Sequence, residues 1–326
     1  MYQITYKNMW AQLKADLIGK DSHRGITLTY AWLANQFGHF GIGYILTVII
    51  YFGFKSYFEN PILTAPLIVV GVVIVFELYN FLGPLLKKSE AQKPFKPAWL
   101  HIAFDTATDV LFFSLGAFST SLLSENTMLQ WIALIILLIL SYPIYYWYRT
   151  KMFQQNACYP FQLRLSQWDY KIDDSDLQKI LQFINNKNTT NSCIIIFGNH
   201  QNIKTRLAVS IANECSIKHH ACYYTTLIKL LSNQTSPENF DKTSLWPWYE
   251  SELLVIDDVS YDCLNGAEII TPEIVLERLK AKQFVGHFKN KNSIWVLGIT
   301  YGSENWVTML EQLGINQANI TAIYLN

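Results

Sequence analysis

Residues Cys193–Thr205 read CIIIFGNHQNIKT, and this stretch decides how the C-terminal half of the chain is interpreted. The run CIIIF is short, apolar and rich in β-branched residues, which is typical of a buried strand. Gly198 follows it, and the residues Arg206–Glu214, RLAVSIANE, have the composition of a helix. The stretch therefore predicts a strand, a glycine turn and a helix in direct succession.

The turn matches the phosphate-binding motif G-x-x-x-x-G-K-[ST] with one departure, because Ile203 occupies the second glycine position. In such a loop, backbone N–H groups surround a phosphate and the lysine reaches the β- and γ-phosphates. We expect nucleotide binding by Gly198, Asn202, Ile203, Lys204 and Thr205, with Lys204 also acting in catalysis. A β-branched residue at position 203 is strained if the loop needs a positive φ there. The alternative is a strand–turn–helix that keeps the fold without the ligand.

A second motif, LLVIDDVS at Leu253–Ser260, is an apolar strand that ends in two aspartates. This is the Walker B pattern. At the tip of the strand, Asp257 is placed to hold Mg²⁺ together with Thr205, and Asp258 to orient or deprotonate an attacking water. Adjacent carboxylates repel each other unless a cation or hydrogen bonds compensate them. The sequence therefore predicts ATP and Mg²⁺ as ligands.

Strand and helix signals alternate through residues 150–326, which predicts a mainly parallel, five-stranded α/β domain. Pro272 is well placed to begin a helix, because the N–H that it lacks would be unpaired there anyway. The predicted strands are Cys193–Phe197, Ala221–Tyr224, Leu253–Asp257, Ile294–Gly298 and Ile320–Leu325. The predicted helices are Lys204–Ile217, Thr226–Ser232, Thr271–Gln283 and Glu304–Leu313.

The ordered set FGNHQNIKTRLAVSIANE, YYTTLIKLL and LLVIDDV resembles the DnaA/IstB branch of the AAA+ proteins, which are P-loop ATPases of the ASCE type. The resemblance covers about 130 residues. It implies that the strand Ile294–Gly298 carries a polar sensor residue, with Thr300 the candidate, and that a neighbouring subunit completes the site. Arg278 is the candidate for an arginine finger. The chain departs from the family in lacking a helical lid domain after the fifth strand.

Four long apolar stretches precede this domain, at residues 37–58, 61–86, 101–123 and 129–148. Each is near the ~20 residues that a membrane-spanning helix needs. We therefore expect a cytoplasmic segment at 1–36, a four-helix transmembrane bundle at 37–149 and the P-loop domain at 150–326.

Charge in the loops predicts the orientation. Lysines and arginines gather in the N-terminal segment, in the loop between the second and third spans, and after the fourth span, whereas the other two loops are short and nearly uncharged. The positive-inside rule places such segments in the cytoplasm. We expect a multi-pass protein of the bacterial inner membrane with both termini in the cytoplasm. A formal net charge of zero and no long basic run give no sign of nucleic-acid binding.

Five ionisable residues fall within the apolar stretches: His39, Glu77, His101, Asp105 and Asp109. The last three are spaced by four, so they share one helix face. A charge at mid-membrane costs roughly 2.5–3.5 kcal/mol on insertion scales, so such residues usually face the bundle interior and pair. One hypothesis is a shared site for a metal, a proton or a lipid head group. The other is a polar lock that fixes helix packing.

These residues also carry a resemblance to the VanZ-like and YjdF-like inner-membrane proteins over residues 30–148. It rests on H-F-x-x-G at His39, E-L-Y at Glu77, D-x-x-x-D at Asp105 and the Gly116–Ala117 pair. The resemblance implies a membrane fold.

The leading hypothesis is a membrane-anchored P-loop NTPase-like subunit of a larger inner-membrane assembly that binds ATP. Hydrolysis of the bound ATP is a further hypothesis. The expected partners of the subunit are membrane lipid and either further copies of the chain or other membrane proteins. The first alternative is a non-catalytic scaffold or assembly subunit. The second is a small transport or headgroup-binding membrane protein that uses the intramembrane polar residues.

Overall fold

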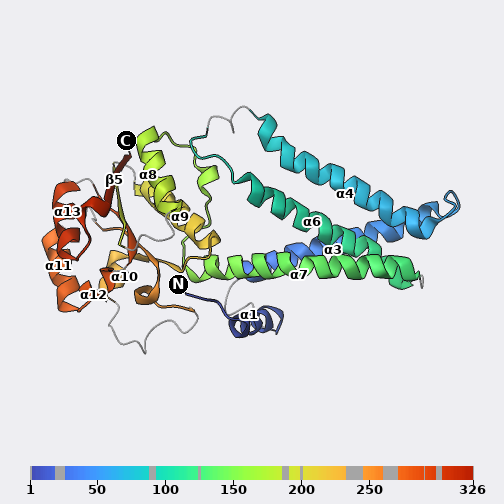
Figure 1. The fold of residues 1–326 in the computed structure, drawn as a ribbon, viewed down its shortest axis with the longest axis horizontal. Helices are drawn as coiled ribbons and strands as arrows, with labels where there is room; N and C mark the ends of the chain where they lie inside the picture. The colour runs from blue at the N-terminus through green and yellow to red at the C-terminus, as the bar shows by residue number, and fades with distance from the viewer. Residues whose placement is uncertain are drawn as a thin grey trace, which may run out of the picture. The chain divides into compact units, whose positions relative to one another are not determined.

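The computed structural model describes residues 2–18, 26–87, 93–123, 126–185, 191–198, 201–232, 245–259, 271–289, 291–298 and 303–325. The chain divides into two compact units. One is Thr5–Lys151, and the other joins Met1–Ile4 to Met152–Asn326. Each is described by itself (Figure 1).

The first unit is helical, and four of its helices are long and apolar enough to cross a membrane. They match the four predicted stretches, although the first begins at Leu28 and not at residue 37. It begins there because the Thr27 side chain accepts a hydrogen bond from the Tyr30 N–H, which is an N-cap. The helices are α1 (Tyr6–Ile18), α3 (Leu28–Phe54), α4 (Pro61–Leu86), α6 (Trp99–Ser119), η1 (Thr120–Leu123) and α7 (Thr127–Asn156).

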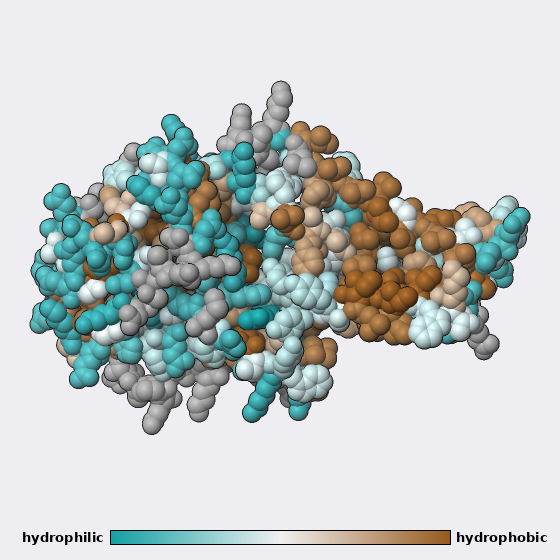
Figure 2. Space-filling model, in the orientation of Figure 1, coloured by the Kyte–Doolittle hydropathy of each residue, from teal (hydrophilic) through white to brown (hydrophobic). Residues whose placement is uncertain are grey.

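Two glycines let α3 and α6 approach closely. A Cβ at Gly43 would lie 2.1 Å from the carbonyl oxygen of Phe113, and a Cβ at Gly116 would lie 2.0 Å from that of Phe40. Only glycine fits at such a crossing, as is common between membrane helices. Large apolar side chains instead cover the outside of the unit, where Figure 2 shows hydrophobic residues gathered over these helices.

The second unit contains a parallel sheet with the strand order β2-β3-β4-β1-β5. Two strands, β3 and β5, have the predicted bounds. The strands are β1 (Cys193–Gly198), β2 (Cys222–Thr226), β3 (Leu253–Asp257), β4 (Asn292–Val296) and β5 (Ile320–Leu325). The predicted bounds of the second and fourth strands were wrong by two residues at the C-terminal end, and β4 also begins two residues earlier than predicted.

Helices cover both faces of the sheet (Figure 1). Pro272 begins α11 as predicted, after a Thr271 N-cap. The sequence interpretation missed α8 and α12. The helices are η2 (Leu165–Gln167), α8 (Asp174–Asn185), α9 (Gln201–Ile217), α10 (Leu227–Ser232), η4 (Trp248–Glu250), α11 (Pro272–Ala281), α12 (Val285–Phe288), α13 (Ser303–Gln312) and η5 (Gln317–Asn319).

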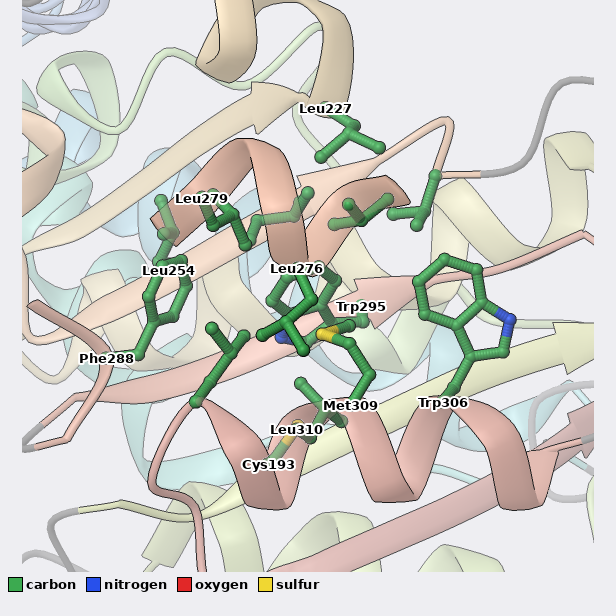
Figure 3. Close-up of a cluster of buried hydrophobic side chains, with 14 of the residues drawn as sticks. Cys193, Leu227, Leu254, Leu276, Leu279, Phe288, Trp295, Trp306, Met309 and Leu310 are labelled. Carbon is green, nitrogen blue, oxygen red and sulfur yellow. The ribbon is translucent and has the colours of Figure 1, made fainter. Parts of the chain in front are cut away.

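A large hydrophobic cluster fills one side of the sheet (Figure 3). Leu254 and Trp295 contribute from the strands, and Leu276, Trp306 and Leu310 from α11 and α13. Alternate strand residues point to the opposite face, where α9 packs against β1, β2, β3 and β4. This packing fixes the N-terminal end of α9 at the carboxyl edge of the sheet.

Candidate functional site

The two sequence motifs meet at the carboxyl edge of the sheet. The Thr205 hydroxyl, in the first turns of α9, donates a hydrogen bond of 2.8 Å to Oδ2 of Asp257 at the end of β3. Asp257 is 1% exposed, so its charge depends on partners within the protein. The structure thus brings together the hydroxyl and the carboxylate that the sequence assigned to one Mg²⁺ ion.

Lys204 lies beside this pair and is almost fully buried, at 2% exposed. Its Nζ donates to the backbone carbonyl of Leu297, the residue after β4. A buried ammonium is costly unless it is hydrogen-bonded. The contact holds the amine at the same sheet edge as Asp257.

Tyr224, in the middle of β2, was missed by the sequence interpretation. Its hydroxyl donates a 2.6 Å hydrogen bond to Oδ2 of Asp257, the same oxygen that accepts the hydrogen bond from Thr205. Burial, together with the hydrogen bond to Asp257, raises the pKa of the Tyr224 phenol well above its usual range, so it remains a donor. No sequence signal identified Tyr224, because its contact depends on the pairing of β2 with β3.

The backbone at Asp258 is unusual, with φ at 53°. This left-handed region is tolerated by aspartate better than by most residues, and such conformations cluster at functional sites. The Asp258 N–H donates 2.8 Å to Oδ1 of Asp257. Both oxygens of Asp257 therefore have donors, and the carboxylate is held in one orientation.

Helix α9 begins at Gln201, three residues before the predicted start at Lys204. Ile203 lies in the first turn of α9, where isoleucine has a higher helix propensity than the glycine of the motif. Ile203 is helical and is not among the described residues with positive φ, so the backbone strain considered for this position is not present. The first N–H groups of α9, including that of the exposed Asn202, lack partners within the helix and suit an anion.

Gly198 has a structural requirement of its own. Its φ is 149°, and a Cβ there would lie 1.9 Å from the carbonyl oxygen of Leu325 on β5. The close approach of the last strand therefore demands glycine whether or not a phosphate binds.

Two further predictions concern Thr300 and Arg278. Thr300 is outside the residues that the structure describes. Arg278 is exposed on α11.

The donor set fits a nucleotide with a hard metal ion. Within the described residues, no group of three or more His, Cys, Asp and Glu could hold a metal. Mg²⁺, however, is usually bound by one or two protein oxygens together with substrate phosphates and water. Thr205 and Asp257 have oxygens of this kind, and Lys204 has a positive charge of the sign that phosphates require.

The structure also brings together some of the polar residues that the sequence places in the apolar helices. His39 Nε2 lies 3.6 Å from Oδ1 of Asp109, which also accepts 3.1 Å from the amide of Gln36. Gln36, which the sequence interpretation missed, is 2% exposed. On α4, Glu77 is buried as well.

The other two predicted ionisable residues of α6 have different surroundings. His101 packs against the ring of Trp147 at 4.6 Å, and Asp105 is exposed. The His39–Asp109 contact pairs α3 with α6, which either hypothesis for this cluster requires.

The comparisons with known proteins give little further guidance. No family model matches the chain, and no curated protein matches it. The resemblance to VanZ-like proteins therefore stays a prediction. Among solved structures, a crystal structure of the DnaC helicase loader matches with 18% identity over 48% of this chain and 94% of that one, at a TM-score of 0.32.

Proposed function

We propose that this protein is a membrane-anchored P-loop NTPase-like subunit of a larger inner-membrane assembly, and that it binds ATP with Mg²⁺ at the carboxyl edge of its sheet. The observation that carries the proposal is the hydrogen bond between Thr205 and Asp257. It joins the residue after the P-loop lysine to the Walker B aspartate, as a shared metal site requires.

The strand order supports the same proposal. Strand β4 lies between β1, which leads into α9, and β3, which carries Asp257. An extra strand between the two motifs is the arrangement that the ASCE resemblance implies. Ligands in open parallel sheets bind at the carboxyl ends of the strands, where these residues lie.

Each residue has a role in this proposal. Lys204 would leave the Leu297 carbonyl and bind the β- and γ-phosphates, while the N–H groups of the first turn of α9 would face the same anion. Thr205 and Asp257 would hold Mg²⁺, which neutralises phosphate charge when bound. Asp258 would orient or deprotonate the attacking water if the ATP is hydrolysed.

The membrane part of the proposal rests on four helices of sufficient length and hydropathy. Positive charge in the loops favours cytoplasmic termini, which would put the nucleotide site where ATP is available. The AAA+ resemblance implies that a neighbouring subunit completes the site, which favours assembly either with further copies or with other membrane proteins.

ATP binding by the purified full-length protein, with and without Mg²⁺, tests the proposal. Lys204→Ala should lose binding, and Lys229→Ala, which removes an exposed lysine from α10, should retain it. Turnover in the wild type would establish hydrolysis. If neither wild type nor variants bind any nucleotide, the scaffold alternative stands in its place.

A second candidate function rests on the His39–Asp109 contact. In this view the bundle binds a lipid head group or a transported species at the polar residues of α3 and α6. Mass spectrometry of molecules that co-purify with the wild type but not with Asp109→Asn would support it, and identical profiles would leave the contact as a packing lock.

A further inference from the structure

Helix α1 is fixed to the rest of its unit by a buried carboxylate. Asp16 is 7% exposed, and its Oδ2 accepts 2.9 Å from the hydroxyl of Tyr148 on α7. Its Oδ1 accepts 3.0 Å from Thr27, the N-cap of α3, and 2.7 Å from Gln12 within α1. These bonds attach α1 where α3 begins and where the apolar part of α7 ends.

A contact between two aromatic rings lies near the same position along α7. Tyr6 lies 5.6 Å from Tyr145, and the polar residues Arg149 and Lys151 follow within two turns. In a chain that spans a membrane, the change from apolar to charged residues along a helix marks the membrane–water boundary. Helix α1 is therefore attached at the depth of that boundary.

The outer face of α1 is apolar and basic. Tyr6, Trp10, Leu17 and Ile18 are between 63% and 78% exposed. Lys7 and Lys14 are exposed as well, and the helix's single acidic residue, Asp16, is the buried anchor. The accessible face therefore carries positive charge and large apolar groups with no opposing carboxylate.

We infer that α1 lies in the head-group layer of the membrane, with Trp10, Leu17 and Ile18 in contact with lipid and Lys7 and Lys14 on anionic head groups. Tryptophan and tyrosine favour this layer because one part of each ring system is apolar and another is polar. Basic side chains beside an apolar face are typical of helices that bind anionic membrane surfaces. The inference rests on the membrane anchoring proposed above.

The position of α1 in the chain gives the contact a consequence. Residues before Thr5 belong to the other unit, where the Tyr2 N–H donates 2.8 Å to Glu252 and Ile4 is buried. A helix held at the membrane surface is thus joined directly to the unit that carries the candidate nucleotide site. The chain before α1 is therefore a second covalent connection between the two units, in addition to the one through α7.

Fluorescence quenching in proteoliposomes tests the inference. The full-length protein would be placed in vesicles that contain anionic lipid and a lipid brominated near the head-group end of its acyl chains. Subtracting the spectrum of Trp10→Phe from the wild-type spectrum isolates Trp10. Trp131→Phe is the matched control, because Trp131 lies in the apolar part of α7 and is 62% exposed, close to the 69% of Trp10.

We expect the contributions of both tryptophans to be quenched severalfold relative to vesicles without bromine. Quenching of Trp131 but not of Trp10 would overturn the inference and leave water or a protein partner on this face. If Trp131 is also unquenched, the membrane anchoring itself is wrong. Lys7→Gln with Lys14→Gln should weaken the quenching of Trp10, and unchanged quenching would overturn the role of anionic lipid.

Discussion

Thr205 and Asp257 are 52 positions apart in the chain and are joined by a hydrogen bond of 2.8 Å. The bond connects the start of α9 to the end of β3, although β4 separates β3 from the strand that leads into α9. Parallel strands place all their carboxyl ends at one edge, so residues that are distant in sequence meet there. The pair is the central contact of the candidate site.

Thr205→Val should abolish the Mg²⁺-dependent part of ATP binding, because valine keeps the shape of threonine but offers no oxygen to the metal. We expect at least a tenfold loss of affinity in Mg²⁺, which corresponds to about 1.4 kcal/mol, and little change in EDTA. Calorimetric titration in both conditions measures this. Thr308→Val, at an exposed position of α13, is the control. Equal losses with and without Mg²⁺ would argue against a role at the metal.

Tyr224→Phe should lower the Mg²⁺ concentration needed for half-maximal ATP binding. The phenol donates a hydrogen bond to Oδ2 of Asp257, so removal of the hydroxyl leaves that oxygen more available to the metal or to a water bound to it. The raised pKa of Tyr224 means that the hydroxyl remains a donor up to and beyond the ordinary tyrosine pKa of about 10.

The measurement is a Mg²⁺ titration of ATP binding in wild type and Tyr224→Phe. A severalfold shift to lower Mg²⁺ is expected, with thermal stability in the absence of Mg²⁺ slightly reduced because a hydrogen bond is lost. A shift to higher Mg²⁺ would show instead that the tyrosine positions the carboxylate for the metal.

Gly43→Ala should destabilise the helical unit. The added Cβ would meet the Phe113 carbonyl at 2.1 Å, and forcing extra volume into a packed contact costs about 1–3 kcal/mol. Gly41→Ala on the same helix is a matched control, because a Cβ there meets nothing within 4 Å. Thermal unfolding in detergent should show a lower midpoint for Gly43→Ala only. Equal midpoints would contradict the close approach of α3 and α6.

Stability should rise with pH above about 7 because of Lys291. Burial lowers the pKa of this amine to about 7, from an ordinary 10.5. Its partners are the Trp248 carbonyl and the Ser251 hydroxyl. Between these two pH values the unfolded chain binds a proton that the folded chain does not, so the free energy of unfolding increases with pH by up to about 1.4 kcal/mol per unit.

Below about pH 7 both states are protonated, and this contribution to stability is absent. Lys291→Met should therefore flatten the pH dependence of the thermal midpoint, whereas Lys280→Met, at an exposed site on α11, should leave it unchanged. An unaltered profile in Lys291→Met would assign the pH dependence to other groups.

The sequence predicted the elements with the strongest apolar patterns. LLVID and ITAIYL were assigned as strands with the observed bounds, because they are short and contain β-branched residues, which favours a strand over a helix. The four membrane-length helices were found for a similar reason. In contrast, α1 and α8 combine apolar and polar residues and were missed, although the apolar residues of α8 recur at helical spacing.

The site was predictable in part. Lys204, Thr205 and Asp257 could be assigned from spacing, since a known chemistry requires those residue types. Tyr224 could not, because a hydrogen bond across two strands depends on strand pairing. The same holds for Gln36, whose partner Asp109 is 73 positions away.

The sequence by itself determined the apolar spans, the alternation of strands and helices, and the residue types available to a phosphate and a metal, because these depend on composition and local period. Only the tertiary structure decided the strand order, the hydrogen bonds that Asp257 accepts from Thr205 and Tyr224, and the glycine contacts between α3 and α6. Those features arise from residues far apart in the chain that packing brings within hydrogen-bonding or van der Waals distance, and no local pattern encodes such distances.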